Sequence, residues 1–538
     1  MKLLNCRTRQ IEEFSGTAIS KSYAILSHRW ENDEVIYKDF RTPAIAAQKA
    51  GWEKIDNFCR VALDNGYEYV WIDTCCINKE DLTELTEAIN SMFKWYARSA
   101  VCYTYLSDIT LGEPFEDSLW FTRGWTLQEL IAPARMEFFD KDWKRIGTRL
   151  ELRQVIQKRT RIVGEIFDET SEARNIKTIL ARNSVARRMS WAAGRTTTRE
   201  EDRTYSLLGI FSVNMPLLYG EGSRAFIRLQ EEIAKESNDL SLFAWTRLEW
   251  QIESRENGLE SSTRPGLPEE PCGVLAVSPD EFRLSHDVIL RRDTKYNPEF
   301  TITNKGLKIT IGAAVTREHI WRISLGCAAD SHPRHAISIL LREVGGGVFV
   351  RWNANSRIQW PGDNQGHDMT FYIKKSIDWD ERSMVTSQLS SMFHRSFQFH
   401  AKGEVNFGKA MPALNWSKEQ NSFTTQGVDR FEGFVICTRN LTNANGGNTN
   451  LSFVVACGIG PEGKAWVCVG SARRVNRSLF EAAENADLHQ VGVLGMEAGR
   501  YKSNATKTKV EVHGMRGRIQ TKLRADKSDV LDIIVEIR

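Results

Sequence analysis

The sequence lacks the features that mark membrane, secreted and nucleic-acid-binding proteins. Its 538 residues carry 72 basic and 69 acidic side chains, so the formal net charge of +3 provides no strong field toward nucleic acid or an anionic membrane. No stretch approaches the ~20 apolar residues that span a bilayer, and residues 1–10 have no apolar run of signal length. We therefore expect a cytoplasmic protein with no membrane span and no nucleic-acid partner.

Metal-binding and disulfide patterns are also missing. The ten cysteines are scattered and contain no C-x-x-C pair, which is typical of reduced, buried thiols. His28 is the only histidine before residue 286, so a zinc site built on several histidines is excluded from the N-terminal region. His332 and His335 are separated by Pro333 and are more typical of surface loops. The sequence therefore predicts no metal and no bound cofactor.

Two common catalytic signatures are absent as well. No G-x-x-x-x-G-K-[ST] occurs, and the glycine pattern of residues 220–225 follows Pro216 rather than a strand, so we expect a turn before a helix over 223–235. The N-terminal region has no G-x-S-x-G, and neighbouring side chains such as Ser27 and His28 point to opposite faces of a strand. A P-loop and a serine nucleophile therefore have little support.

Three regions of different pattern fill the chain, which is too long for a single core. Residues 1–150 alternate short apolar runs with amphipathic stretches, which predicts an α/β domain with a parallel sheet. The pattern of residues 151–255 is helical and predicts a helical extension of this domain. A stretch rich in Ser, Gly, Pro and Glu, residues 253–271, is the expected boundary. Residues 270–538 show alternating runs and glycine-rich turns, which predict a β-rich, sandwich-like C-terminal domain.

The α/β pattern places polar residues at the ends of its strands. Ligands of open parallel sheets bind in the crevice at these carboxyl ends. Three polar sets fall there, namely Ser27 with His28, Asp73 with Asn78, and the loop leading to Glu129, and they could converge in one crevice. The expected strands are 23–27, 69–73, 101–106 and 136–139, and the expected helices are 44–64, 82–98 and 125–130.

The segment Arg123–Pro133 contains a tryptophan and a glutamate at helical spacing. Residues four apart share a helix face, so the Glu129 carboxylate is expected over the Trp125 ring, where a partly apolar setting can tune it and hold it against a sugar ring. This arrangement suits a glycosidase. The alternative is ordinary packing, in which Trp125, Leu127 and Leu130 are core and Glu129 is an exposed helix residue or caps a neighbour.

A basic stretch, residues 182–203, carries one tryptophan, Trp191. Basic side chains with an aromatic ring could bind nucleic acid, but Glu200, Glu201 and Asp202 interrupt this run. We expect instead a solvated helix and loop that pack on the first domain.

Three blocks of the chain together resemble the signature of the fungal heterokaryon-incompatibility (HET) domain. They are Tyr23–Trp30, Trp71–Asn78 and Arg123–Pro133, in the order and approximate spacing of that family. The resemblance continues to about residue 250 and does not cover the C-terminal half. It implies a role in fungal nonself recognition and regulated cell death. The segments that extend it are Arg188–Ala193, Glu201–Phe211 and Met215–Gly222.

HET domains are in turn regarded as distant relatives of TIR domains, a flavodoxin-like α/β class that includes enzymes cleaving NAD. The strand ending at Ser27 resembles the first TIR strand, and Trp125–Leu130 resembles the TIR W-C-x-x-E-L helix. That match assigns the catalytic role to Glu129, while Thr126 stands where TIR sequences often have Cys. The resemblance therefore implies a flavodoxin-like, TIR-like sheet and NAD as the candidate substrate.

The chemistry of NAD cleavage agrees with a single carboxylate. Nicotinamide in NAD is already a cationic leaving group, so the reaction needs stabilisation of an oxocarbenium-like ribose, which an ionised Glu129 would supply. His28 either contacts the ligand or pins its loop through a structural hydrogen bond. The expected substrate contacts are stacking by Trp30 and Trp125, acceptance from ribose hydroxyls by Ser27 and Asp73, pyrophosphate contact by Arg29 or Arg123, and further contacts by His28 and Asn78.

Two functions remain open for this region. The first is an NAD glycohydrolase (NADase) that acts in programmed cell death and is switched on by self-association or by a protein partner through the β-rich half. The second is a noncatalytic TIR-like signalling module that only assembles with partners. Replacing Glu129 by Gln separates them, because an enzyme without this charge loses NAD turnover, while an adaptor of unchanged shape keeps its signalling.

Overall fold

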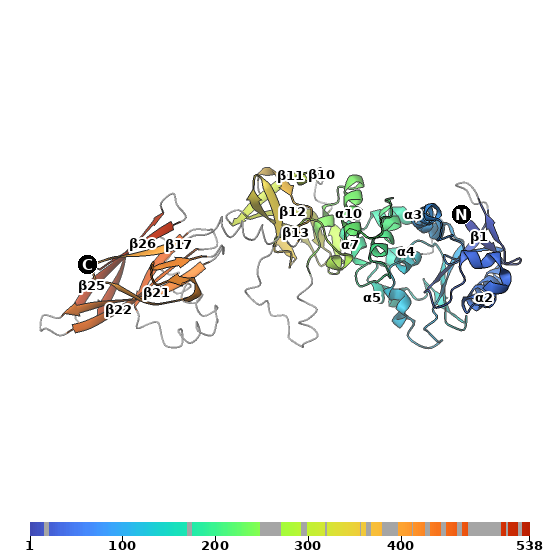
Figure 1. The fold of residues 1–538 in the computed structure, drawn as a ribbon, viewed down its shortest axis with the longest axis horizontal. Helices are drawn as coiled ribbons and strands as arrows, with labels where there is room; N and C mark the ends of the chain where they lie inside the picture. Colours follow the sequence, from blue (N-terminus) through green and yellow to red (C-terminus); the bar gives the residue numbers. More distant parts are fainter. Residues whose placement is uncertain are drawn as a thin grey trace. The chain divides into compact units, whose positions relative to one another are not determined.

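The computed structural model (Figure 1) divides into two compact units. The boundary expected at 253–271 lies almost wholly outside the described residues. One unit comprises Met1–Ala314, Arg322–Leu341 and Val348–Ser376, and the other comprises Val315–Trp321, Arg342–Gly347 and Ile377–Arg538. The described residues are 1–14, 21–168, 175–247, 271–291, 298–317, 320–355, 357–361, 367–378, 396–411, 413–425, 431–442, 448–459, 465–471, 507–512, 515–525 and 530–537.

The first unit begins with a seven-stranded sheet in the order β2-β1-β4-β3-β5-β6-β7. Its four central strands are parallel and pair in the order second, first, third, fourth along the chain, as in flavodoxin-like sheets. The predicted α/β class is therefore confirmed. The strands are β1 (Lys2–Asn5), β2 (Ile11–Glu13), β3 (Tyr23–His28), β4 (Tyr69–Trp71), β5 (Val101–Tyr105), β6 (Met136–Phe139) and β7 (Arg145–Thr148).

The central strands are the ones that the sequence predicts. β3 is buried at all six positions, as expected for a strand covered on both faces, and Trp71 of β4 is fully buried. The antiparallel strands β1, β2 and β7 are not predicted, because each has only three or four residues and no long apolar run.

Four helices lie in the connections between these strands, and the expected helix over 44–64 is divided into two. Asp81 caps the longest helix by accepting from the backbone N–H groups of Thr83 and Glu84, and the buried stripe of that helix follows the expected spacing. The helices are α1 (Pro43–Ala46), α2 (Gly51–Asp64), α3 (Leu82–Arg98) and α4 (Thr126–Ile131).

Six further α-helices lie in the described part of the region predicted to be a helical extension. One of them, α9, packs so closely on α3 that a Cβ atom on Gly209 would lie 2.1 Å from Phe93 Cβ. The glycine pattern near residue 220 is a turn, as predicted, since Gly220 and Gly222 have φ of 97° and 55°. The helices are α5 (Arg153–Thr160), α6 (Ile176–Ala181), α7 (Val185–Ser190), α8 (Glu200–Tyr205), α9 (Leu208–Phe211) and α10 (Arg224–Glu236).

The basic stretch 182–203 packs on the first domain, but the prediction that it is solvated is wrong at Arg195. This side chain is only 4% exposed, and its Nη1 donates to Arg123 O at 2.9 Å and to Thr126 Oγ1 at 3.0 Å. Burial lowers the pKa of Arg195 to about 9. Carbonyl and hydroxyl oxygens at the start of α4 therefore take the place of water around its guanidinium.

The C-terminal half is β-rich, as predicted. A nine-stranded sheet has the order β10-β11-β16-β14-β13-β12-β9, with β15 paired to β13 and β8 to β14, and β11 also pairs with β12. Its strands are β8 (Pro271–Cys272), β9 (Val288–Leu290), β10 (Phe300–Thr303), β11 (Gly306–Arg317), β12 (Ile320–Ala329), β13 (His332–Gly345), β14 (Val348–Trp352), β15 (Ile358–Pro361) and β16 (Asp368–Ile373).

The second unit contains two more sheets that share one core. Their orders are β19-β20-β17-β26-β25-β24 and β18-β21-β22-β23, and Phe399 and Ile533 of the first pack in one cluster with Val435 and Phe453 of the second. This is a sandwich-like arrangement. The strands are β17 (Ser396–Lys402), β18 (Asn406–Met411), β19 (Trp416–Ser417), β20 (Ser422–Thr424), β21 (Phe431–Thr442), β22 (Asn448–Ile459), β23 (Ala465–Ser471), β24 (Lys507–Val512), β25 (Met515–Ala525) and β26 (Val530–Ile537).

Two further properties bear on the expected environment of the protein. Nine cysteines in the described part of the chain are free and buried, which agrees with the expectation of reduced thiols. Within the same ranges, no helix combines the length and the apolar composition that crossing a bilayer requires.

Candidate functional site

The end of β3 and the helix α4 bring Ser27 and Glu129 into direct contact. Ser27 Oγ donates to Glu129 Oε2 at 2.5 Å, and Trp120 Nε1 donates to Ser27 Oγ at 2.9 Å. All three side chains are buried, and Glu129 is only 5% exposed. A hydroxyl has one hydrogen and an indole nitrogen is a donor only, so Trp120 leaves the Ser27 hydrogen free to point at Glu129.

The start of α4 is held by the segment that follows α7. Gly124 N donates to Thr196 O at 2.8 Å, and a Cβ atom on Gly124 would lie 2.5 Å from Thr197 Cγ2, so a larger residue could not approach this closely. The hydrogen bonds of the buried Arg195 add to these contacts. The position of Glu129 therefore depends on the helical region as well as on the sheet.

Burial controls the protonation of Glu129. Burial is the main cause that raises the pKa of this carboxyl to about 8. The hydrogen bond from Ser27 has the next largest effect and opposes it, the negative charge of Asp73 raises the pKa further, and Arg123 and Tyr96 lower it by smaller amounts. In this conformation the group is mostly protonated at neutral pH. The expectation from the sequence was an ionised carboxylate, because nothing in the sequence shows how completely the side chain is enclosed.

His28, the next residue of β3, faces a different set of side chains. Its Nε2 lies 3.9 Å from Glu34 Oε1 and 3.9 Å from Asp73 Oδ1, which is too far for a direct hydrogen bond. Burial, followed by the positive charges of Lys54 and Lys79, lowers the pKa of His28 well below its ordinary value. The imidazole is therefore neutral at physiological pH.

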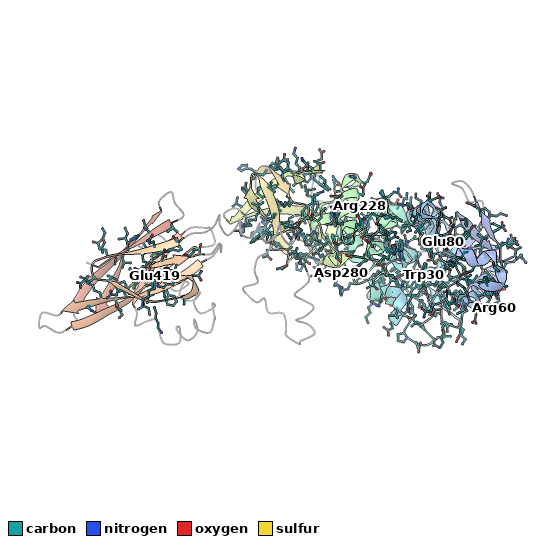
Figure 2. The ribbon with its side chains drawn as sticks, in the orientation of Figure 1. Trp30, Arg60, Glu80, Arg228, Asp280 and Glu419 are labelled. Atoms are coloured by element: carbon teal, nitrogen blue, oxygen red, sulfur yellow. The ribbon has the colours of Figure 1, made fainter. Side chains whose placement is uncertain are left out.

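Trp30 and Lys79 complete this second set. Trp30, labelled in Figure 2, is 42% exposed, and its Nε1 donates to Asp73 Oδ2 at 2.8 Å. Lys79 Nζ lies 3.3 Å from the centroid of the Trp30 ring, and burial lowers the pKa of Lys79 although the charge of Asp73 opposes this. Together, these residues form the His28 cluster, which consists of His28, Trp30, Glu34, Lys54, Asp73 and Lys79.

Two predicted residues serve the loops around the site. Arg29 Nη1 pairs with Asp108 Oδ2 at 3.3 Å, so in this conformation its charge is already matched. Asn78 Oδ1 accepts from Glu80 N at 3.3 Å, within the connection between β4 and α3. Both interactions stabilise the loops that follow β3 and β4.

The remaining two predicted residues lie at the start of α4. Trp125 is half-buried and hydrogen-bonds to Asp202 of α8, whereas the indole that contacts the Ser27–Glu129 pair belongs to Trp120. Arg123 acts through its charge, which lowers the pKa of both Glu129 and His28. The structure thus brings five of the nine predicted residues into two adjoining sets and leaves Arg29, Asn78, Arg123 and Trp125 at their edges.

Several residues of the site escape sequence reasoning. Trp120 lies in the short 3-10 helix η3 (Leu119–Thr122), where no periodic pattern marks it. Glu34 sits in a polar loop among other charged residues, and Arg195 comes from a different region of the chain. Lys79 directly follows Asn78 in a strand-end loop, and this position is the one usable signal for it.

Two regions of the chain match known family models. Residues 23–111 match the model described as heterokaryon incompatibility protein (HET), and residues 224–311 match a domain of unknown function (DUF8212). The first match contains Ser27, His28 and Asp73 and ends before Glu129.

A curated protein is also similar to this chain. Vegetative incompatibility protein HET-E-1 of Podospora anserina is 42% identical over 282 residues, which cover 49% of this chain. The alignment covers 20% of that protein, so the chain spans about a fifth of the length of this relative. The predicted resemblance to HET proteins is therefore confirmed, on the family match over residues 23–111 and on this relative.

Proposed function

We propose that this chain takes part in fungal heterokaryon incompatibility and that its TIR-like N-terminal domain hydrolyses NAD at the bond between nicotinamide and ribose. Similarity to the HET model and to a vegetative incompatibility protein supports the first part. The observation that carries the second part is the convergence of Ser27, Asp73 and Glu129 at the carboxyl ends of parallel strands, where open α/β sheets bind their ligands.

The proposed reaction begins with a change in the charge of Glu129. The cationic nicotinamide ring lowers the pKa of Glu129 as it approaches, because a positive charge favours the carboxylate. The carboxylate stabilises the positive ribose as the C1′–N bond breaks and its electron pair leaves with nicotinamide. Water then adds to C1′ and loses a proton to Glu129, which restores the protonated acid. Ser27 holds the carboxyl in position throughout.

Access to Glu129 requires a movement of its neighbours. The side chain is 5% exposed and is hydrogen-bonded to the buried Ser27, which also accepts from the buried Trp120, so a dinucleotide reaches it only when neighbouring side chains shift. Self-association or a protein partner would supply such a shift. The proposal therefore includes activation by association.

The same burial supports a second function, that of a noncatalytic module that signals by assembling with partners. A protonated glutamic acid that is hydrogen-bonded to Ser27 is a satisfied buried polar pair, and such pairs stabilise folds without any chemistry. In that case Glu129 is a structural residue of an interaction domain.

The deciding experiment measures nicotinamide released from NAD by the purified full chain, both dilute and artificially clustered. Glu129→Gln keeps the shape and can accept from Ser27 but carries no charge, so turnover should fall by roughly 100-fold or more. Glu87→Gln, at an exposed position of α3, is the matched control and should leave turnover unchanged. If clustered wild-type protein leaves NAD intact while Glu129→Gln still signals cell death, the noncatalytic function is correct.

A further inference from the structure

The His28 cluster contains buried polar atoms without partners. His28 Nε2, Glu34 Oε2 and Lys79 Nζ find no hydrogen-bond partner among the described residues, and neither does Thr74 Oγ1, next to Asp73. The His28 side chain is only 1% exposed. Buried polar groups in native proteins are almost always paired, so several unpaired atoms at one strand end indicate a place prepared for a ligand.

The charges of the cluster cancel. Glu34 forms an ion pair with Lys54, and Asp73 and Lys79 interact through their opposite charges, so two carboxylates face two ammonium groups. His28 is neutral because burial disfavours its charged form. A ligand group with a full charge would disturb this balance in a poorly solvated site, whereas a neutral polar group would not.

Hydroxyl groups match the arrangement of these partners. His28 Nε2 is 3.9 Å from each of two carboxylate oxygens, a gap that one hydroxyl oxygen can bridge with hydrogen bonds of ordinary length. Lys79 offers a donor, and the exposed ring of Trp30 offers an apolar face on which a sugar can pack. In the described ranges, no three His, Cys, Asp or Glu side chains are arranged as metal ligands.

We propose that the His28 cluster binds the vicinal diol of a ribose ring, which makes Glu34 and Lys79 substrate-binding residues. This inference rests on the proposed NAD hydrolysis. Asp73 links the two sets of side chains, because it lies 3.9 Å from His28 and also acts on Glu129 through its charge. The ribose in the cluster is therefore the one bonded to nicotinamide, with its hydroxyls at Asp73 and its anomeric carbon toward Glu129.

A chemical double-mutant cycle tests this assignment. The full chain, artificially clustered as in the assay of nicotinamide release, is titrated in a calorimeter with two uncleavable carbocyclic analogues of NAD, one with both hydroxyls on the nicotinamide-side ring and one without them. Wild-type protein should bind the first about tenfold more tightly, as expected for one or two hydrogen bonds. In Lys79→Met, which keeps an apolar side chain over Trp30, the ratio should fall to about twofold.

A control variant and a second cluster variant show whether a change in the ratio is specific to the His28 cluster. Lys94→Met, the same change at an exposed position of α3, should keep the wild-type ratio. Asp73→Asn should lower the ratio as Lys79→Met does, and it replaces that variant if Lys79→Met does not fold. Equal binding of both analogues by wild-type protein, no binding of either, or an unchanged ratio in the cluster variants overturns the proposal.

Two further measurements separate competing explanations. If Lys79→Met loses affinity for inorganic pyrophosphate while the hydroxyl ratio stays the same, Lys79 binds a phosphate and the diol assignment is wrong. Nicotinamide release from NAD is followed in parallel. Hydroxyl-dependent binding without release supports the cluster and rejects hydrolysis, whereas release with a ratio near one rejects the cluster and leaves hydrolysis intact.

Discussion

Ser27 and His28 are neighbours in the chain, yet they lie in two opposite kinds of site. Successive side chains of a strand point to opposite faces, so β3 directs Ser27 toward α4 and His28 toward the loop that carries Glu34. On the Ser27 side the hydroxyl and the Glu129 carboxyl are paired and enclosed. On the His28 side several polar atoms are enclosed without partners. Asp73 interacts with both sides.

The difference shows how the end of one strand can carry a fully hydrogen-bonded pair on one face and unpaired polar atoms, available to a ligand, on the other. The paired side holds Glu129 as a protonated acid, which does not have to keep a charge in a buried place. The unpaired side lowers stability until a ligand supplies the missing hydrogen bonds, as is common at functional sites. Variants that break the hydrogen bonds of Ser27 and Glu129 should therefore reduce NAD turnover most. Measurements of the proton held by Glu129 then define the difference between the two sides more sharply.

After Glu129→Gln itself, the largest effect is expected from removing the donor that directs Ser27. Trp120→Phe leaves the Ser27 hydroxyl free to turn away from Glu129, and this loss of a hydrogen bond raises the pKa of the carboxyl further. We expect kcat for NAD to fall roughly 10- to 100-fold with little change in KM, and the rising part of the pH profile to move to higher pH.

A second buried tryptophan separates this positioning role from simple loss of packing. Trp71→Phe removes an indole of β4 that is fully buried and whose Nε1 has no hydrogen-bond partner among the described residues. It should lower the free energy of unfolding about as much as Trp120→Phe and leave the pH profile in place. Equal pH profiles for the two variants would show that Trp120 acts only through packing.

The sequence predicts this site in part, for physical reasons that differ between residues. Buried parallel strands have long apolar runs, so the strand ends, and with them Ser27 and Asp73, are placed correctly. Helical spacing puts Trp125 near Glu129, but the Asp202 contact of Trp125 depends on a helix some 75 positions later in the chain. Trp120 and Arg195 reach the site through nonperiodic segments. Contacts of that kind are determined by tertiary packing and leave no local signal.

A smaller effect is expected on stability as a function of pH. Unfolded Glu129 ionises near its ordinary pKa of 4.5, while the folded group keeps its proton up to about pH 8. The folded state therefore holds the extra proton in this window, and stability falls as pH rises through it. The change amounts to on the order of a few kcal/mol for a shift of this size.

Urea unfolding at pH 5 and pH 8 measures this contribution. Glu129→Gln cannot ionise, so its stability should decline less than that of wild-type protein over the same interval. Parallel declines in the two proteins would mean that Glu129 is not a raised-pKa acid in the folded chain. In that case the Ser27 side of β3 would not hold a protonated acid, and the proposed difference from the His28 side would be wrong.

The smallest expected effect is the release of less than one proton per molecule when a cationic ligand binds beside the protonated Glu129. A positive nicotinamide ring beside Glu129 should lower its pKa, so binding of the carbocyclic NAD analogue at pH 7 should release most of one proton. Titration in two buffers of different ionisation enthalpy measures this release. ADP-ribose has no cationic ring and should release much less, and Glu129→Gln should abolish the difference between the two ligands. If the analogue and ADP-ribose release the same number of protons, the bound nicotinamide does not lie beside Glu129, and the side of β3 that carries Ser27 is structural.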